Sequence, residues 1–133
     1  MGVSGLTLGR MIGQFSGIAL ECRDPRALAA FYSAVTGWPV AYDSDDWVSI
    51  GLPDQDMWHL SFQRSPGHQP PTWPDDASSM QFHLHFRVPD LDAGERDVLA
   101  LGGTKFALQP DPAGSRVLAD PAGHPFCLVR ARE

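Results

Sequence analysis

The pattern of apolar and polar positions predicts a strand, a helix and three strands in the first half of the chain. Residues 15–22 form the predicted strand. Asp24 then supplies an N-cap and Pro25 occupies the first helical position. The apolar side chains that follow have the i, i+3, i+4, i+7 spacing of one helical face: Leu28, Phe31, Tyr32 and Val35. Gly37 is placed to end the helix. The three predicted strands are 38–43, 46–52 and 57–64.

The second half of the chain repeats this order. Residues 80–88 predict a strand, Asp90 caps a helix with Leu91, Val98 and Leu101 as its apolar positions, and three strands follow at 104–109, 115–119 and 125–130. The pairs Asp24 and Asp90, Gly37 and Gly103, and Arg64 and Arg130 are each 66 residues apart. A long period that occurs twice indicates a pseudo-symmetric pair of modules rather than a solenoid.

We therefore expect one domain over residues 1–133, built from two βαβββ modules at 15–64 and 80–131. Residues 1–14 are predicted to be an arm. Residues 65–79 hold four prolines without periodicity and are predicted to be a linker. Trp73, within that linker, is expected to be a lid over a binding site or a dimer contact.

Composition narrows the classes of partner. The 133 residues carry ten Lys+Arg and sixteen Asp+Glu, a net charge of −6, which argues against a nucleic-acid or anionic-membrane surface. No apolar run approaches the roughly 18 residues of a membrane-spanning helix. Cys22 and Cys127 make no disulfide framework, so a reduced, cytoplasmic protein is expected.

Three stretches of the chain resemble a known family. "RDPRALAAFYSAVTGWPV", "VPDLDAGERDVLALGG" and "LADPAGHPFCLVR" resemble the module signatures of the glyoxalase/bleomycin-resistance/dioxygenase superfamily, also called vicinal oxygen chelate proteins. The resemblance implies an α+β fold in which two βαβββ modules form a curved eight-stranded cup, with helices on the outer face and a ligand inside. It also implies a homodimer. Fold analogy leaves the reaction open, because members include lyases, isomerases, dioxygenases and antibiotic-binding proteins.

The resemblance also places the family's metal ligands. Counted from the helix-capping aspartates and the closing strand, those four positions hold Gly17, Ser61, His83 and Cys127. Glycine has no donor and a neutral serine is a poor one, whereas a catalytic divalent site uses three protein ligands plus an open position. We therefore expect no metal site and no cofactor, and no standard glyoxalase I activity.

An alternative is a metal site with relocated ligands. Strand alternation places Gly17, Ala19 and Glu21 on one face, and His83, His85 and Arg87 on the matching face of the second module. His-x-His on a strand is a metal-ligand spacing because both imidazoles point to one side. The candidates for such a site are Glu21, His59, His83, His85 and Cys127.

The same alternation gives the expected site residues. Glu21 and His85 are predicted catalytic groups, as general bases. The predicted ligand-binding residues are His59, Ser61, Gln63, His83, His85 and Cys127. The alternatives without a functional role are an ion pair between Glu21 and Arg87, and a Cys127 that fills space as a small apolar side chain. Phe82, Leu84 and Phe86 are expected to pack under the second helix, and Cys22 under the first.

Three functions remain open at this point. The leading one is a small-molecule-binding protein with a degenerate metal site, which either sequesters its ligand or catalyses a metal-free isomerase- or lyase-type reaction. The second is a metal-dependent lyase, isomerase or dioxygenase with relocated ligands. The third is a non-catalytic interaction module. The expected partners are a small organic molecule and a second copy of the chain, with no nucleic acid and no membrane.

Overall fold

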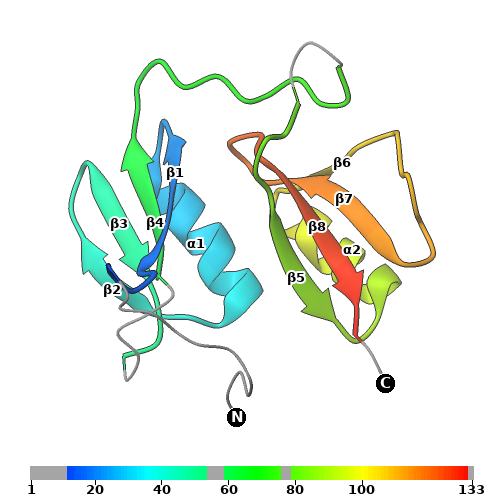
Figure 1. Ribbon diagram of the computed structural model, residues 1–133, viewed down its shortest axis with the longest axis horizontal. Helices are drawn as coiled ribbons and strands as arrows, with labels where there is room; N and C mark the ends of the chain where they lie inside the picture. The colour runs from blue at the N-terminus through cyan, green and yellow to red at the C-terminus, as the bar shows by residue number, and fades with distance from the viewer. Residues whose placement is uncertain (1–11, 54–58, 76–78, 132–133) are drawn as a thin grey trace.

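The computed structural model describes residues 12–53, 59–75 and 79–131, and these form two similar modules (Figure 1). The elements of the first module are β1 (Gly17–Cys22), α1 (Pro25–Thr36), β2 (Val40–Asp43), β3 (Trp47–Ile50) and β4 (His59–Arg64). Those of the second are β5 (Leu84–Val88), α2 (Leu91–Ala100), β6 (Thr104–Lys105), β7 (Ser115–Ala119) and β8 (Pro125–Arg130). The predicted βαβββ repeat and the α+β class are confirmed.

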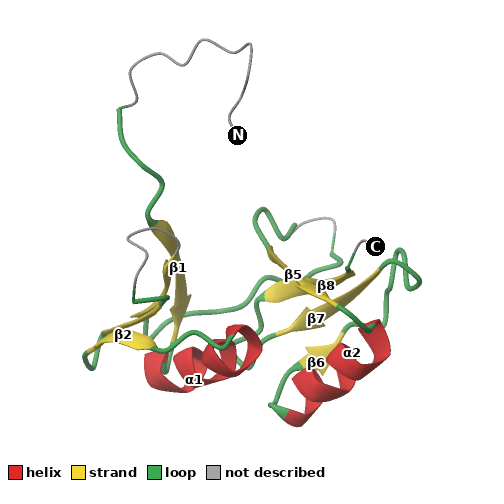
Figure 2. Cartoon of the chain, turned by 90° about the horizontal axis from the view of Figure 1, so that it is seen from below, coloured by secondary structure: helices red, strands yellow, loops and turns green. Residues whose placement is uncertain are grey.

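Each module forms a four-stranded sheet with the same strand order. The orders are β1-β4-β3-β2 and β5-β8-β7-β6, and the first and last strands of each module pair in parallel. In the described part of the chain no strand pairing joins the two sheets, so the eight strands form two open sheets. Both helices lie on the same side of the strands and leave the other side uncovered (Figure 2). This arrangement agrees with the expected curved cup.

Local chemistry fixes both ends of α1. The side chain of Asp24 accepts a hydrogen bond from the Ala27 backbone N–H, and Pro25 begins the helix. Gly37 ends it with φ 76°, a left-handed conformation in which its backbone N–H donates to the Ser33 carbonyl. The second helix begins in the same way, because the Asp90 side chain accepts from the Ala93 backbone N–H.

The core lies between the helices and the two sheets, and Tyr32 of α1 is at its centre. Its ring stacks on Phe62 of β4 at 5.6 Å between centroids, and it contacts Phe86 of β5 and Phe126 of β8 at 6.0 Å each. Its hydroxyl donates to Asp120 Oδ2 at 2.6 Å. Burial raises the pKa of Tyr32 far above the ordinary tyrosine value, and Asp120 adds to the shift. Tyr32 of the first helix therefore contacts the second module through both its ring and its hydroxyl.

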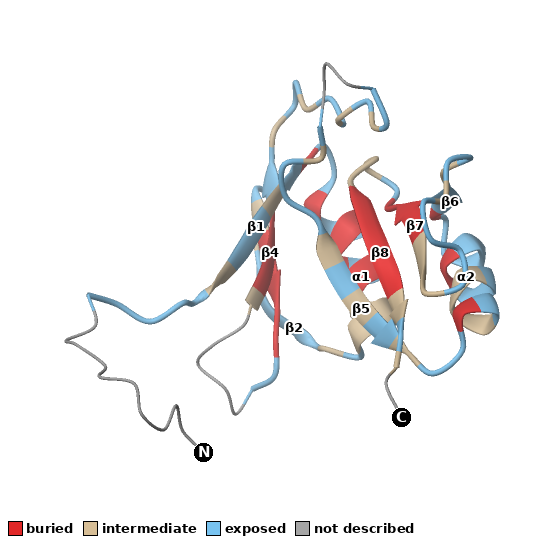
Figure 3. Ribbon diagram, turned by 45° about the vertical axis from the view of Figure 1, so that its right-hand side comes forward, coloured by how far each residue is buried: buried red, intermediate tan, exposed pale blue. Residues whose placement is uncertain are grey.

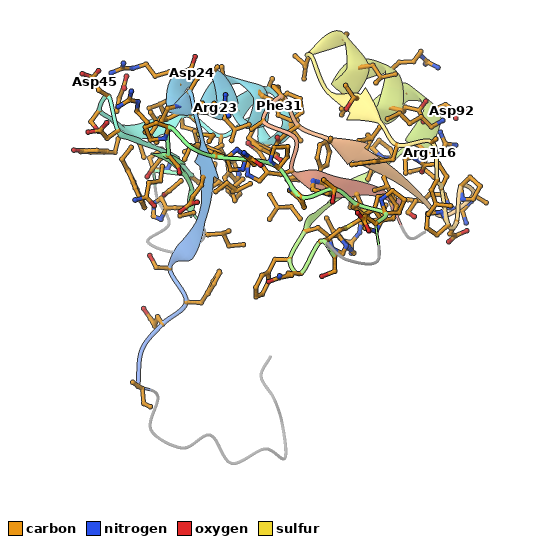
Figure 4. All side chains as sticks on the ribbon, turned by 90° about the horizontal axis from the view of Figure 1, so that it is seen from above. Arg23, Asp24, Phe31, Asp45, Asp92 and Arg116 are labelled. Carbon is orange, nitrogen blue, oxygen red and sulfur yellow. The ribbon has the colours of Figure 1, made fainter. Side chains whose placement is uncertain are left out.

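Ion pairs attach α2 to its sheet. The guanidinium of Arg116 on β7 contacts Glu95 Oε1 at 2.8 Å and Asp92 Oδ1 at 2.9 Å (Figure 4). Arg116 therefore lies on the helix side of β7, although it is charged. The aliphatic part of the arginine covers apolar surface there while its charge is neutralised.

The structure corrects four expectations. The strand expected at 80–88 begins at Leu84, since Gln81 has φ 61° and interrupts the extended backbone. Phe82 consequently does not pack under a helix and is 91% exposed, whereas Leu84 and Phe86 do pack against the core. Leu101 lies at the C-cap of α2 and is 42% exposed, and β6 covers only two residues of the strand expected at 104–109.

Among the described residues, no helix is both long and apolar enough to span a bilayer.

The Tyr32 hydroxyl can be removed without altering the ring. Tyr32→Phe should lower the free energy of unfolding by about 1–3 kcal/mol, because the buried Asp120 loses a hydrogen-bond donor. Urea denaturation measures this. Tyr42→Phe is the matched control, since Tyr42 is 58% exposed and should change stability by less than about 0.5 kcal/mol. Equal effects of the two variants would show that the Tyr32–Asp120 bond does not join the modules.

Candidate functional site

A groove of about 660 Å³ lies between the two modules, lined by β1 on one side and by residues 82–84, His124 and Pro125 at the starts of β5 and β8 on the other. We call it the inter-module groove. Its lining residues are Phe15, Gly17, Ile18, Ala19, Leu20, Glu21, His68, Phe82, His83, Leu84, His124 and Pro125. Most of this wall is apolar, and its few polar groups are one carboxylate and three imidazoles. Such a composition is typical of sites for small organic molecules.

The groove exists because β1 and β5 are the edges of their sheets. Figure 3 shows β1 as a largely exposed strand and β8 as a buried one. Ile18 is 42% exposed and Phe82 91% exposed, although both are large apolar side chains. Apolar side chains that line an open groove provide area for an apolar ligand to cover.

The first module does not provide the metal ligands of the family. A Cβ atom at Gly17 would collide with the backbone carbonyl of His59, so the backbone excludes any side chain at this position. Ser61 is buried, and its hydroxyl shares a 2.7 Å hydrogen bond with that of Ser49. Trp47 Nε1 donates to the Ser49 hydroxyl at 2.9 Å, so the three side chains form a chain of hydrogen bonds. The donor set of the two-module metal centre therefore does not fit this protein.

The second module brings three of the predicted residues together. His83, His85 and Cys127 each offer a donor atom, and these atoms all lie within 4.8 Å of one another. The two Nε2 atoms of His83 and His85 are 2.9 Å apart, so one ring donates to the other. The expected strand parity is thus confirmed for this pair, because Leu84 and Phe86 point to the core and the histidines to the open side.

Burial shifts the pKa values of His83 and Cys127. Burial lowers the pKa of His83 and the neighbouring His85 adds to the effect, which favours the neutral imidazole. Burial raises the pKa of the Cys127 thiol, so in the metal-free protein the thiol is less acidic than a free cysteine. Cys22 lies on the opposite side of its strand, is 1% exposed and packs in the core under α1, as expected.

The remaining predicted residues lie in two places. Glu21 lines the inter-module groove, and in the described chain no salt bridge joins it to Arg87. His59 and Ser61 line a separate hollow of about 470 Å³ on the open face of the first sheet, beside Tyr42 and Trp47. Gln63 is exposed next to Glu21 in the strand register. The structure therefore separates the predicted site residues into a groove set, a first-sheet set and the His83–His85–Cys127 cluster.

Sequence reasoning missed two histidines of the groove. His124 Nδ1 lies 2.8 Å from Asp120 Oδ2, and the other oxygen of Asp120 accepts from the backbone N–H groups of Ala122 and His124. His68, from the linker, packs against the His124 ring at 4.9 Å between centroids. By its sequence, Asp-Pro-Ala-Gly at 120–123 indicates a turn and nothing more. The sequence feature that could have identified this site residue is the spacing of His124, four residues after Asp120.

Trp73 of the linker packs edge-on against Phe106 at 5.0 Å between centroids. It is not among the residues that line the groove.

Comparisons with known proteins agree with this geometry. A family model described as a glyoxalase-like domain matches residues 17–129. The fosfomycin resistance protein FosX of Listeria monocytogenes has a TM-score of 0.66 at 19% identity, over 92% of this chain and 96% of that one. A glyoxalase/bleomycin resistance protein/dioxygenase family enzyme of Burkholderia phytofirmans has a TM-score of 0.63 at 20% identity, over 88% and 98%.

A third similar structure is the bleomycin-binding protein of Streptomyces verticillus in complex with copper(II)-bleomycin. Its TM-score is 0.55 at 18% identity, over 92% of this chain and 100% of that one. No curated protein matches the sequence. At these identities the solved structures establish the fold.

Gly17 offers a test of the close approach between β1 and β4. Gly17→Ala should destabilise the protein by about 1–3 kcal/mol, because the new methyl group forces the backbone of His59 to move. Chemical denaturation measures the change. Gly67→Ala is the control, since nothing lies within 4 Å of its added Cβ and its stability should stay the same or rise slightly. A neutral Gly17→Ala would mean that the first module has room for a ligand side chain.

His68 makes stability depend on pH. Burial and His124 lower its pKa in the folded protein, so the unfolded chain binds more protons between that value and about 6.5. Its contribution is present above pH 6.5 and is lost as the pH falls through the folded pKa. Glu21, Arg23, Asp120 and His124 surround it. His68→Gln should flatten the dependence of unfolding free energy on pH in that range, measured by urea denaturation at each pH. An unchanged slope would contradict the assignment.

Proposed function

Because this chain belongs to the glyoxalase-like domain family, we propose that it binds a small organic molecule in the inter-module groove. The observation that carries the proposal is the groove itself, with its apolar walls and its few polar groups. An apolar body covering Ile18, Leu20 and Leu84 would remove their surface from water, and burial of apolar surface contributes about 25 cal/mol per Å². The polar groups would fix its orientation.

Polar recognition in the groove comes from four side chains. Glu21 is the acid among the described lining residues, and His68, His83 and His124 are the imidazoles. An imidazole ring nitrogen can take part in hydrogen bonds as donor or acceptor, so these side chains suit a ligand with hydroxyl, carbonyl or amide groups. The bleomycin-binding protein of Streptomyces verticillus is an example of small-molecule recognition on this fold.

The proposal includes a place for proton transfer. Glu21 lines the groove and is free of the ion pair with Arg87 that would fix its charge, so we retain it as the candidate general base. His85 is not among the groove-lining residues, and its ring contacts His83 instead. His124, whose Nδ1 is oriented by Asp120, is better placed than His85 for acid–base work. The homodimer expected from the family resemblance stays a prediction.

A fluorescent probe with an apolar body and one anionic group tests the groove. We expect 8-anilinonaphthalene-1-sulfonate to bind saturably to the folded protein, with NMR shift changes centred on β1 and residues 82–84. Ala19→Phe should weaken this binding at least about tenfold, since the new ring occupies the groove.

The matched control is Ala113→Phe, which adds the same ring at an exposed loop position away from the groove. It should leave the affinity unchanged. Unsaturable binding, or equal affinity in the two variants, would count against a ligand site between the modules. Circular dichroism of both variants checks that each is folded.

A further inference from the structure

His83, His85 and Cys127 form a cluster within the second module that no comparison assigns a role. Their three donor atoms lie within 4.8 Å of one another, and the Nε2 atoms of the two histidines are 2.9 Å apart. The rings of the two histidines are 4.8 Å apart between centroids. Two imidazole nitrogens and one sulfur thus converge on one point, from β5, the residue just before it, and β8.

The strand register produces this convergence. β5 and β8 pair in parallel with His85 directly opposite Cys127, and His83 precedes His85 by two residues on the same side. β8 is an interior strand of its sheet, between β5 and β7. Leu84, Phe86 and Leu128 point the other way into the core and hold both strands in place. His85 and Cys127 are therefore fixed by paired strands, and His83 lies one residue before β5 with its ring against His85.

We propose that His83, His85 and Cys127 bind one Zn²⁺-class metal ion. Two imidazole nitrogens and one thiolate are the ligands that zinc prefers, and the Zn–N and Zn–S bonds are about 2.0–2.1 Å and 2.3 Å long. Around a tetrahedral ion these bonds place the donor atoms roughly 3.3–3.6 Å apart. The present separations bracket that range, so small side-chain rotations complete the site.

Three protein ligands leave the fourth tetrahedral position open. Zinc sites that retain an open position bind water or a substrate there. His83 also lines the inter-module groove, so the ion would lie beside it. The metal site itself does not depend on the proposed groove ligand.

This site differs from the metal centre implied by the family. That centre takes ligands from both modules. The first module's two ligand positions hold Gly17, where no side chain fits, and Ser61, whose hydroxyl is bonded to that of Ser49. The proposed site lies within the second module and uses His85, which is not one of the four family positions. The expectation of no metal came from counting those four positions, and the structure adds the ligand that the count left out.

Cobalt(II) is the spectroscopic probe for this site. Untagged protein, stripped with a chelator under reducing conditions, is titrated with Co²⁺ and followed by visible and near-ultraviolet absorption. We expect saturation at one equivalent, d–d bands of tetrahedral intensity, and a thiolate-to-cobalt charge-transfer band. One equivalent of Zn²⁺ should abolish the spectrum by displacing the cobalt.

Matched variants decide the assignment. Cys127→Ser should remove the charge-transfer band, whereas Cys22→Ser should keep it, because Cys22 packs in the core away from the cluster. His83→Gln and His85→Gln should each weaken binding at least about tenfold, the loss that follows removal of even an outer-shell partner. His59→Gln, on the other sheet, should have no effect.

Three results would overturn the proposal: no saturable binding, a charge-transfer band that survives Cys127→Ser, or equal losses in the His85 and His59 variants. The metal-stripped protein is also titrated with 8-anilinonaphthalene-1-sulfonate. If the dye still binds while cobalt does not, the metal site is wrong and the groove proposal stands.

Discussion

The contact between Tyr32 and the second module is the interaction on which the rest of the structure depends. No strand pairing joins the two described sheets, so side-chain contacts hold them together, and those of helix α1 are central to the shared core. Tyr32 stacks on Phe62 of its own sheet and contacts Phe86 and Phe126 of the other, while its hydroxyl donates to Asp120 at 2.6 Å. Phe31 adds a second ring against Phe126 at 6.0 Å. The groove between β1 and β5 is the space that this connection leaves open.

The same contact links the core to the groove. Asp120 accepts from Tyr32 on one side and lies 2.8 Å from His124 Nδ1 on the other. His124 then faces the groove and packs against His68 of the linker. A buried polar network is stable only when each member finds a partner, and here that requirement orients a groove imidazole. The turn that looks purely structural in the sequence thus also sets the chemistry of the site.

The two modules share a backbone plan but differ in side-chain chemistry. At the offset of 66 residues, Gly17 corresponds to His83, Ala19 to His85 and Ser61 to Cys127. The first module therefore presents small side chains and hydrogen-bonded hydroxyls where the second presents two imidazoles and a thiol. Because the backbone at Gly17 excludes a side chain, this asymmetry is part of the packing as well as of the composition.

The sequence by itself determined the elements whose signals are local. Asp24, Pro25 and Gly37 set both ends of α1, the short apolar runs at 115–119 and 125–130 matched the bounds of β7 and β8, and parity placed Cys22 in the core and His83 and His85 on the open side. These features follow from backbone sterics and side-chain period, which neighbouring residues encode.

Only the tertiary structure decided the features that join distant residues. The partnership of Tyr32 with Asp120 spans 88 residues, the hydroxyls of Ser49 and Ser61 share a hydrogen bond, and His68 reaches His124 from the linker. Phe82 falls outside β5 because the backbone turns at Gln81, despite an unbroken apolar pattern. Such contacts depend on how the sheets are arranged in space, and no local periodicity records that arrangement.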